Sequence, residues 1–263
     1  MAISAVVAHG GAGAGPERLA NVERAVAIAA GILDSGGSAI EAAVEACVVL
    51  EDDPVFNAGT GSVFRTDGSV HLDASIQTSE GNMGFVIAMQ DTPNPIRVAA
   101  DLLDEEINGL TGDGARLWAD SKGFEKSIVQ GRPPFEGATD TVGVVARDNS
   151  GLIVCATSTG GTSNRPPGRV GDVPLPGCGF WAQEGVGVGA TGIGEAITRG
   201  MLSFRVAERI LGGGGLEESM MWALEECLED GAEVGIIALG SEGTGYGLAN
   251  SENMPWSSWI ARK

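Results

Sequence analysis

Two threonines stand at the same end of two neighbouring apolar runs. Thr141 begins the run Thr141–Arg147, Thr159 follows the run Leu152–Ser158, and residues 148–151 (DNSG) join the two. Apolar, β-branched runs joined by a short polar turn that contains Gly predict a β-hairpin, which would bring the two threonines together. A threonine at a free chain end can act as a nucleophile without another base, since its own α-amine, with a pKa of about 7.7–8, can take the hydroxyl proton.

Arg169 and Asp172 lie in a short segment that also contains Gly168 and Gly171. Glycine allows sharp backbone turns, so the guanidinium and the carboxylate can face one pocket. Such a cation and anion suit a ligand that has both a carboxylate and an ammonium group, and an amino acid is the simplest such ligand. A mutual salt bridge that fixes the loop is the alternative that these residues leave open.

Periodic apolar residues elsewhere predict the elements that must position these side chains. Val22, Val26, Ala29 and Leu33 have helical spacing, and Ser38 is placed to cap the next helix. Further helices are expected near 96–103, 115–121, 197–208 and 216–228, and strands at 3–8, 63–65, 70–74, 85–89, 186–190, 236–239 and 245–248. The Asp-Gly pair at 67–68 predicts a hairpin between the strands at 63–65 and 70–74. Together these elements indicate a mixed α and β protein.

Composition argues against several classes of protein. The 263 residues carry a formal net charge of −19, and nucleic-acid binding requires basic patches. No run approaches the roughly 18 apolar residues of a membrane span, and the N-terminus lacks the basic flank of a signal peptide, so we expect a cytoplasmic protein. The four cysteines lie far apart without CxxC pairs, which favours buried thiols. Only two histidines are present, which argues against His-dependent triads and His-rich metal sites.

Two further segments are a match to a dinucleotide-binding pattern and a stretch without periodicity. Residues 187–192 match GxGxxG, but a dinucleotide site also needs an acid after the next strand, and the acid with suitable spacing, Glu208, falls in a helical pattern. Residues 122–139 combine Gly, Pro and charge without periodicity, which predicts an exposed linker directly before Thr141.

The sequence resembles the asparaginase/isoaspartyl peptidase family of N-terminal nucleophile hydrolases at TVGVVA (141–146), TSTGG (157–161) and PGRVGD (167–172). Other matches run from His9 to Glu195. That family is made as an inactive precursor, which cuts itself before the Thr of a TVG sequence. The resemblance therefore implies a cut between Asp140 and Thr141 into chains 1–140 and 141–263. It also implies a single α+β domain over residues 1–263, a four-layer αββα sandwich, and a dimer of processed pairs, that is, a heterotetramer.

The resemblance also assigns roles in catalysis. Thr141 would be the nucleophile, Thr159 would orient its hydroxyl, and the Thr191 hydroxyl with the Gly192 N–H would form the oxyanion hole. Arg169 would bind the substrate α-carboxylate and Asp172 its α-ammonium group. The substrate-binding residues that it implies are Asn57, Arg169, Val170, Gly171, Asp172, Thr191, Gly192, Ile193 and Gly194.

No cofactor for the chemistry is implied, but a structural sodium ion is. In the family, backbone carbonyls of the loop after the second helix surround sodium. The corresponding carbonyls here belong to Leu50, Glu51, Asp53, Phe56, Ala58 and Thr60. A plain connection from a helix to a strand is the alternative interpretation of this loop.

The substrates implied are L-asparagine and β-aspartyl dipeptides. One departure from the pattern leaves an alternative open. The residue before the nucleophile is Asp140, as in glycosylasparaginases, whereas plant-type asparaginases usually have Gly there. A glycosylasparaginase-like amidase is therefore the second hypothesis, and an unprocessed acidic binding protein is a third, from another class.

Overall fold

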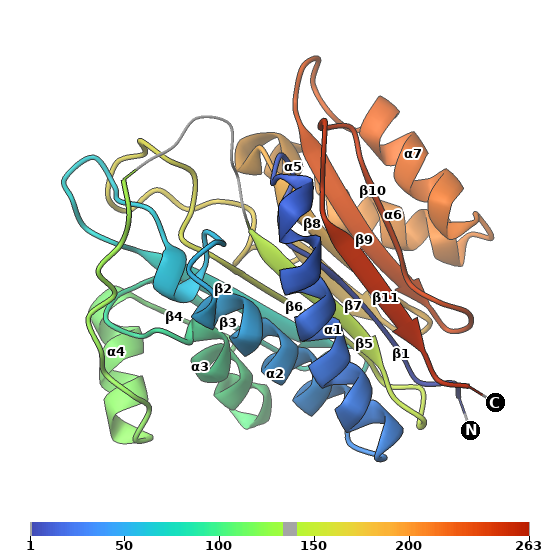
Figure 1. Cartoon of the computed structure of the whole chain (residues 1–263), viewed down its shortest axis with the longest axis horizontal. Coiled ribbons are helices and arrows are strands. Elements are labelled where there is room, and N and C mark those ends of the chain that lie inside the picture. The colour runs from blue at the N-terminus through green and yellow to red at the C-terminus, as the bar shows by residue number, and fades with distance from the viewer. Residues whose placement is uncertain (1, 134–140, 263) are drawn as a thin grey trace.

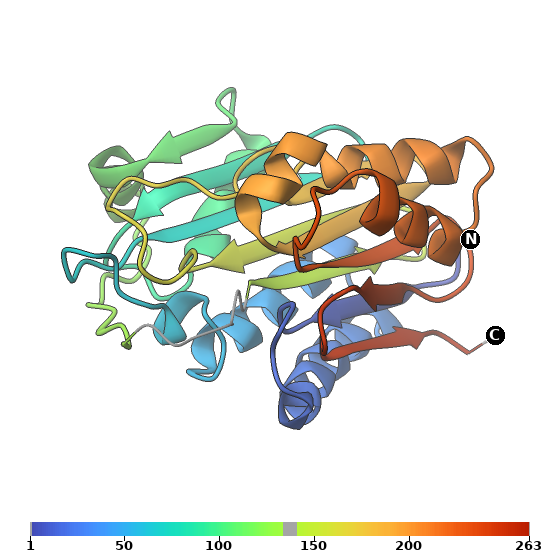
Figure 2. The same ribbon diagram turned by 90° about the horizontal axis from the view of Figure 1, so that it is seen from above.

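The computed structural model describes residues 2–133 and 141–262. Two β-sheets lie face to face, and helices cover the outer face of each, which gives four layers (Figures 1 and 2). This arrangement confirms the expected α+β sandwich.

The larger sheet has seven strands in the order β11-β1-β5-β6-β2-β3-β4. Only β3 and β4 pair in parallel among its described strands. Their bounds are β11 (Trp256–Ile260), β1 (Ala5–His9), β5 (Val142–Arg147), β6 (Ile153–Thr159), β2 (Leu72–Thr78), β3 (Met83–Met89) and β4 (Gly109–Thr111).

The smaller sheet is antiparallel, with strand order β10-β9-β8-β7. Its strands are β10 (Tyr246–Ala249), β9 (Val234–Gly240), β8 (Val186–Gly192) and β7 (Phe180–Gln183). Helices α1 (Leu19–Asp34), α2 (Ala39–Asp52), α3 (Pro95–Asp101) and α4 (Gly112–Ser121) pack on the larger sheet, and α6 (Leu202–Leu211) and α7 (Leu216–Glu226), preceded by the short α5 (Gly194–Gly200), pack on the smaller one.

Side-chain alternation explains why the central strands are apolar throughout. In β1, Val6 and Ala8 point into the core beneath the helices, whereas Ala5 and Val7 point into the core between the two sheets. Both faces of the larger sheet are thus covered, so its central strands need apolar residues at successive positions. The strand after Thr141, β5, alternates in the same way: Val144 points into the core beneath the helices and Val145 into the core between the sheets.

The hairpin between β5 and β6 is confirmed. Val142 lies opposite Ser158 in the antiparallel register. Asp148 closes the turn, accepting the Ser150 N–H at 2.9 Å, and Gly151 has a φ of 97° that only Gly adopts easily. The predicted cap of α2 is also present, since the Ser38 hydroxyl accepts the Glu41 N–H at 3.1 Å.

Two predictions about elements are wrong. Residues 63–65 and 70–74 do not form a hairpin, because β2 begins at Leu72 and its two edges are taken by β3 and β6, which leaves Asp67-Gly68 in a tight turn. The helix expected over 197–208 is broken at Met201, whose φ of 43° ends α5 and redirects the chain into α6. Strands β4, β7 and β11 were not predicted.

The four cysteines are all unpaired thiols, and three of them are buried. The prediction of buried thiols is thus confirmed for Cys47, Cys155 and Cys178, while Cys227 is partly exposed.

Candidate active site

Thr141 and Thr159 meet at one end of the hairpin, as predicted. The Thr141 hydroxyl donates to the Thr159 hydroxyl at 3.1 Å, and Thr159 in turn accepts the Gly161 N–H at 3.0 Å. The Thr159 hydroxyl can itself donate to the Asn57 carbonyl oxygen at 3.5 Å. Both threonines are buried. Thr159 thus fixes the direction of the Thr141 hydroxyl through a network that continues into the backbone.

Asn57 holds the loop that follows Thr159 through hydrogen bonds. Its side-chain amide donates to the Gly161 carbonyl at 2.5 Å and accepts the Val63 N–H at 3.0 Å, while its backbone carbonyl accepts the Gly160 N–H at 2.7 Å. The expected role of Asn57 was substrate binding. The structure shows its side chain ordering the backbone beside the two threonines.

His9, the last residue of β1, packs against β5, the strand that follows Thr141. Burial lowers its pKa to about 3, so the ring is neutral at pH 7. Its Nδ1 accepts the Gly11 N–H at 3.2 Å, which places the ring proton on Nε2. That atom faces Gly143, where an added Cβ would lie 2.4 Å away. An imidazole with so low a pKa is a poor proton acceptor at pH 7, so His9 is not suited to act as a general base.

Arg169 and Asp172 line one space but do not pair with each other. Arg169 binds both carboxylate oxygens of Glu195, with Nε–Oε1 at 3.1 Å and Nη2–Oε2 at 2.7 Å. The Asp172 Oδ2 is buried without a hydrogen-bond partner among the described residues. An added Cβ at Gly194 would lie 2.8 Å from both Arg169 Nη2 and Asp172 Oδ1. The mutual salt bridge considered above is therefore replaced by the pair Arg169–Glu195.

Burial also sets the charge of Asp172. It raises the pKa of this carboxyl to about 7, although the nearby Arg169 acts in the opposite direction. A bound ammonium group would lower that pKa again, since it favours the carboxylate. Asp172 is thus an acid whose charge depends on what occupies the pocket.

Thr191 and Gly192 end strand β8 beside the glycine-rich loop after β1. The Thr191 oxygen accepts the Ala12 N–H at 3.3 Å. Gly192 has a φ of 134°, and an added Cβ would lie 2.3 Å from the Glu233 carbonyl oxygen. Only Gly fits this position, which turns the chain toward α5. Ile193 is the N-cap residue of α5, and its N–H donates to the Glu233 carbonyl at 3.0 Å.

The remaining predicted positions lie on the segment that carries Arg169. Val170 is exposed, and an added Cβ at Gly171 would lie 2.8 Å from Arg169 Nη1. Asp140 lies outside the described residues, so the predicted cleavage junction is described only on the Thr141 side.

Two charged residues at the site were not predicted. Arg65 is 3% exposed, and Asp73 is fully buried in β2, where it lies opposite Thr159. Burial raises the pKa of Asp73 to about 6, and its Oδ1 accepts the Ala88 N–H at 2.7 Å. A carboxyl at the second position of the strand LDASIQT, between Leu72 and Ala74, was the sequence signal that could have revealed Asp73. No comparable signal marks Arg65.

Comparison with known proteins agrees with this geometry. The family model for asparaginase matches residues 2–132 and 127–263. The chain belongs to this family. Curated relatives include a human isoaspartyl peptidase/L-asparaginase, which is 37% identical over 96% of this chain and 92% of its own length. A plant-type L-asparaginase of Pyrobaculum calidifontis is 36% identical over 85% of each chain, and an isoaspartyl peptidase/L-asparaginase of Synechocystis is 33% identical over 90% of this chain and 82% of its own.

The loop after α2 has features that fit a cation. Its two glycines lie against carbonyl oxygens: an added Cβ at Gly61 would lie 2.1 Å from the Phe56 oxygen, and one at Gly59 would lie 2.6 Å from the Glu51 oxygen. Residues with side chains would fill this cradle. Backbone carbonyls gathered in one loop are the hard oxygen donors that such a cation prefers.

The other predicted carbonyls are partly engaged. Those of Asp53 and Ala58 accept the N–H groups of Phe56 at 3.2 Å and Gly61 at 3.1 Å. Each carbonyl has a second lone pair that remains for a cation. Leu50 lies in the last turns of α2, and Thr60 lies in the single 3₁₀ turn over Gly59–Gly61.

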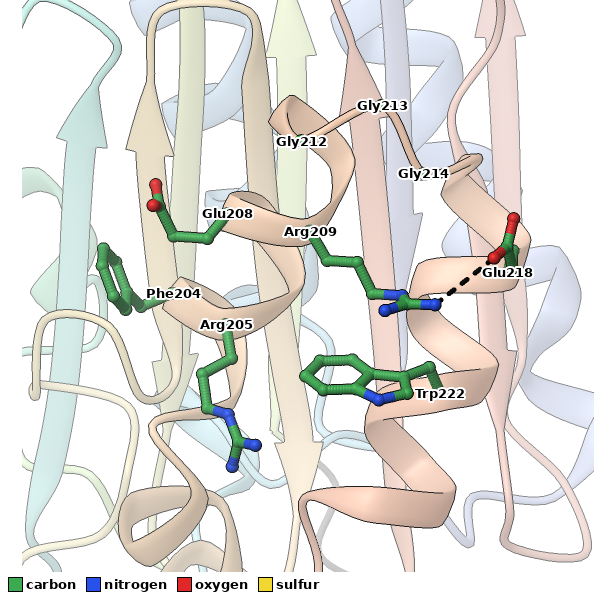
Figure 3. Close-up of a pocket in the computed structure, with 9 residues that line it drawn as sticks. All are labelled: Phe204, Arg205, Glu208, Arg209, Gly212, Gly213, Gly214, Glu218 and Trp222. Carbon is green, nitrogen blue, oxygen red and sulfur yellow. Dashed lines mark hydrogen bonds and ion pairs between the residues drawn. The ribbon is translucent and has the colours of Figure 1, made fainter.

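A separate surface cleft of about 650 Å³ lies between α6 and α7 (Figure 3). Arg205 and Arg209 lie over the ring of Trp222, at 5.3 and 4.8 Å from its centroid, and Arg209 also binds Glu218 at 3.3 Å. The cations of this cleft are thus already engaged, and none of the active-site residues described above lines it.

No helix in the described ranges is both long and apolar enough to cross a membrane.

Proposed function

We propose that this chain is a self-processing amidohydrolase that hydrolyses β-aspartyl dipeptides and the side-chain amide of L-asparagine. The observation that carries the proposal is the hydrogen bond from Thr141 to Thr159, next to a pocket where Arg169 and Asp172 face the same space. The names of the relatives, isoaspartyl peptidase/L-asparaginase, support the same substrates.

Processing would begin with the Thr141 hydroxyl attacking the Asp140 carbonyl carbon. The peptide C–N bond breaks, the amine of Thr141 takes a proton, and an ester links Asp140 to the Thr141 oxygen. Water then hydrolyses this ester, which leaves the Asp140 carboxylate and a free N-terminal Thr141. The result is two chains, 1–140 and 141–263, within one folded domain.

Substrate hydrolysis would use the same oxygen. The α-amine of Thr141 takes the hydroxyl proton, and the oxygen attacks the side-chain amide carbon of the aspartyl group. The Thr191 hydroxyl and Gly192 N–H stabilise the tetrahedral oxyanion, where one donor is worth about 2.7–4 kcal/mol. The amine returns the proton to the leaving nitrogen, and water hydrolyses the ester to release aspartate.

Recognition would depend on two opposite charges. Arg169, oriented by Glu195, binds the α-carboxylate of the substrate, and Asp172 binds the α-ammonium group. The free Asp172 Oδ2 supports this assignment, because a buried acceptor without a partner suits a ligand donor. Val170, Gly171, Ile193 and Gly194 would form the backbone walls of the pocket.

Three wider features belong to the same proposal. Sodium in the loop after α2 would stabilise the backbone that carries Asn57. Processed pairs would assemble as a dimer, without nucleic acid or membrane as partners. A cytoplasmic location is supported by the unpaired thiols, which are typical of reducing compartments.

A glycosylasparaginase-like activity is the second candidate, because Asp precedes the nucleophile at position 140. Purified protein should be assayed with a β-aspartyl dipeptide, L-asparagine and a glycosylated asparagine. Our proposal expects turnover of the first two. Turnover of the glycosylated asparagine alone would favour the second candidate, and a protein that neither cleaves itself nor hydrolyses any of the three would contradict both.

A further inference from the structure

Arg65 is a buried cation without a partner. Its side chain is almost completely inaccessible, and none of its three guanidinium nitrogens has a hydrogen-bond partner among the described residues. Burial lowers the pKa of the group, with only partial compensation from Asp73. Buried charges without partners are rare and costly in folded proteins. Such a group at an active site indicates an anion that is supplied by a ligand.

The position of Arg65 links it to the nucleophile. An added Cβ at Gly161 would lie 2.5 Å from Arg65 Nη1. The N–H of the same Gly161 donates to the Thr159 hydroxyl, which accepts the hydrogen bond from Thr141. The guanidinium therefore lies over the loop that directly follows Thr159. Gly161, with a φ of 78°, carries no side chain that would separate them.

The charges around Arg65 do not neutralise it. Asp73 and Asp67 raise its pKa and Arg169 lowers it, but neither carboxylate forms a hydrogen bond with the Arg65 guanidinium in the described part of the chain. The backbone of Arg165, on the loop that carries Arg169, lies beside the residue that follows Arg65, since its carbonyl accepts the Thr66 N–H at 3.1 Å. The Nε of Arg165 is also buried without a partner among the described residues. These guanidinium nitrogens can thus donate to an anion other than the α-carboxylate bound by Arg169.

We propose that Arg65 forms a second carboxylate subsite, which binds the C-terminal carboxylate of the residue that leaves when a β-aspartyl dipeptide is cleaved. This inference rests on the proposed function, in which Arg169 and Asp172 bind the aspartyl part. L-Asparagine releases ammonia and offers no second carboxylate, whereas a β-aspartyl dipeptide does. Arg65 then makes the dipeptide the preferred substrate.

A structural role is the competing explanation. A change of side-chain torsions could place Arg65 on the unpartnered Oδ2 of Asp73, so that the two neutralise each other in the core. Such a pair would affect every substrate equally, and its loss would lower stability. The subsite and the pair therefore predict different patterns across substrates.

The test compares β-Asp-Leu, its C-terminal amide β-Asp-Leu-NH₂, and L-asparagine in wild type, Arg65→Met and Arg65→Lys. Met keeps much of the side-chain length without charge, and Lys keeps the charge without the planar fork. Arg65→Met should lower kcat/KM for β-Asp-Leu about 10- to 100-fold, while the amide and L-asparagine change less than about threefold. Arg65→Lys should recover part of the loss. Arg205→Met, which removes the same charge from the exposed face of α6, should match wild type on all three.

Equal losses on all three substrates, together with a lower melting temperature, would overturn the subsite in favour of a pair with Asp73. Equal kcat/KM of wild type for β-Asp-Leu and its amide would overturn it without any variant. If wild type hydrolyses none of the substrates, the proposed function fails, and calorimetric binding then tests the subsite separately. In that case, wild type should bind β-Asp-Leu at least about tenfold more tightly than the amide, and equal affinities would exclude the subsite.

Discussion

Both carboxylate oxygens of Glu195 hold the guanidinium group of Arg169, at 3.1 and 2.7 Å. This forked contact fixes the plane of the guanidinium through Nε and Nη2 and leaves Nη1 for another group. In the proposed function, Glu195 would therefore be a positioning residue that acts on the substrate only through Arg169.

Glu195→Gln should weaken substrate binding more than chemistry. The amide cannot accept at both positions, so Arg169 loses one charge-assisted bond and its fixed plane. We expect KM for L-asparagine to rise about 5- to 50-fold with kcat nearly unchanged, and self-cleavage should proceed as in wild type. Steady-state kinetics measure this, with Glu229→Gln as the control, because Glu229 pairs with Arg199 at the surface. A fall in kcat alone would contradict the positioning role.

Thr141→Ala should remain a single chain. The substitution removes the oxygen that attacks Asp140 and leaves the apolar strand β5 intact. Intact mass of the purified protein after long incubation checks this. The matched control, Thr244→Ala at the surface, should give two fragments like wild type. Wild type that persists as one full-length species under these conditions would refute self-processing.

Asp172→Ala should separate processing from turnover. Processing needs no bound amino acid, so the folded variant should cut itself completely. Loss of the partner for the substrate ammonium should lower kcat/KM for L-asparagine about 10- to 150-fold, which corresponds to roughly 1.5–3 kcal/mol. A denaturing gel and an asparagine assay on the same sample suffice. Undiminished hydrolysis by a fully cleaved variant would remove the ammonium-binding role.

The same carboxyl should make stability depend on pH. Its pKa is about 7 in the folded protein and about 3.9 when unfolded. Between these values the folded state holds a proton that the unfolded state has released, so this group's contribution to stability is lost as pH rises from about 4 to about 7. Asp172→Asn has no such proton. Its free energy of unfolding should therefore rise relative to that of the parent protein over this range, by on the order of 2–4 kcal/mol at pH 8.

Urea unfolding at pH 4 and pH 8 measures this difference. Both proteins should carry Thr141→Ala, because a single uncut chain unfolds more simply than two fragments. A stability difference that is the same at both pH values would show that burial does not raise the pKa of Asp172.

Activity should also depend on the monovalent cation. If sodium holds the loop that carries Asn57, replacing it with a bulky organic cation at equal ionic strength should lower kcat/KM several-fold and speed proteolysis within residues 50–61. Potassium at the same concentration is the control for size. Unchanged kinetics and proteolysis in all three salts would identify the loop as a plain connection.

Local patterns were sufficient to predict the centre of the site. The pairing of Thr141 with Thr159 follows from two apolar runs and one turn, all within a single hairpin. The resemblance to the family then supplied Thr191 and Gly192, which no spacing rule would connect to that hairpin.

Long-range packing explains what was missed. Arg65 lies against Gly161, in the loop after β6, and β2 pairs with β3 and β6, whereas the predicted hairpin paired residues 63–65 with 70–74. Strand β11 pairs with β1 from the opposite end of the chain, and its sequence, WSSWI, lacks the apolar continuity of a central strand because it lies at the sheet edge.

The pairing of β1 with β11 has a consequence for engineering. Ala5 lies opposite Ile260, and the Ala261 N–H donates to the Ser4 carbonyl at 2.9 Å, so the two ends of the described chain are neighbours. A short Gly-Ser linker could join them, and a circular permutant could then be translated from Thr141 onward. Once its initiator methionine is removed, such a protein would have Thr141 as its N-terminal residue, and it would need no self-cleavage.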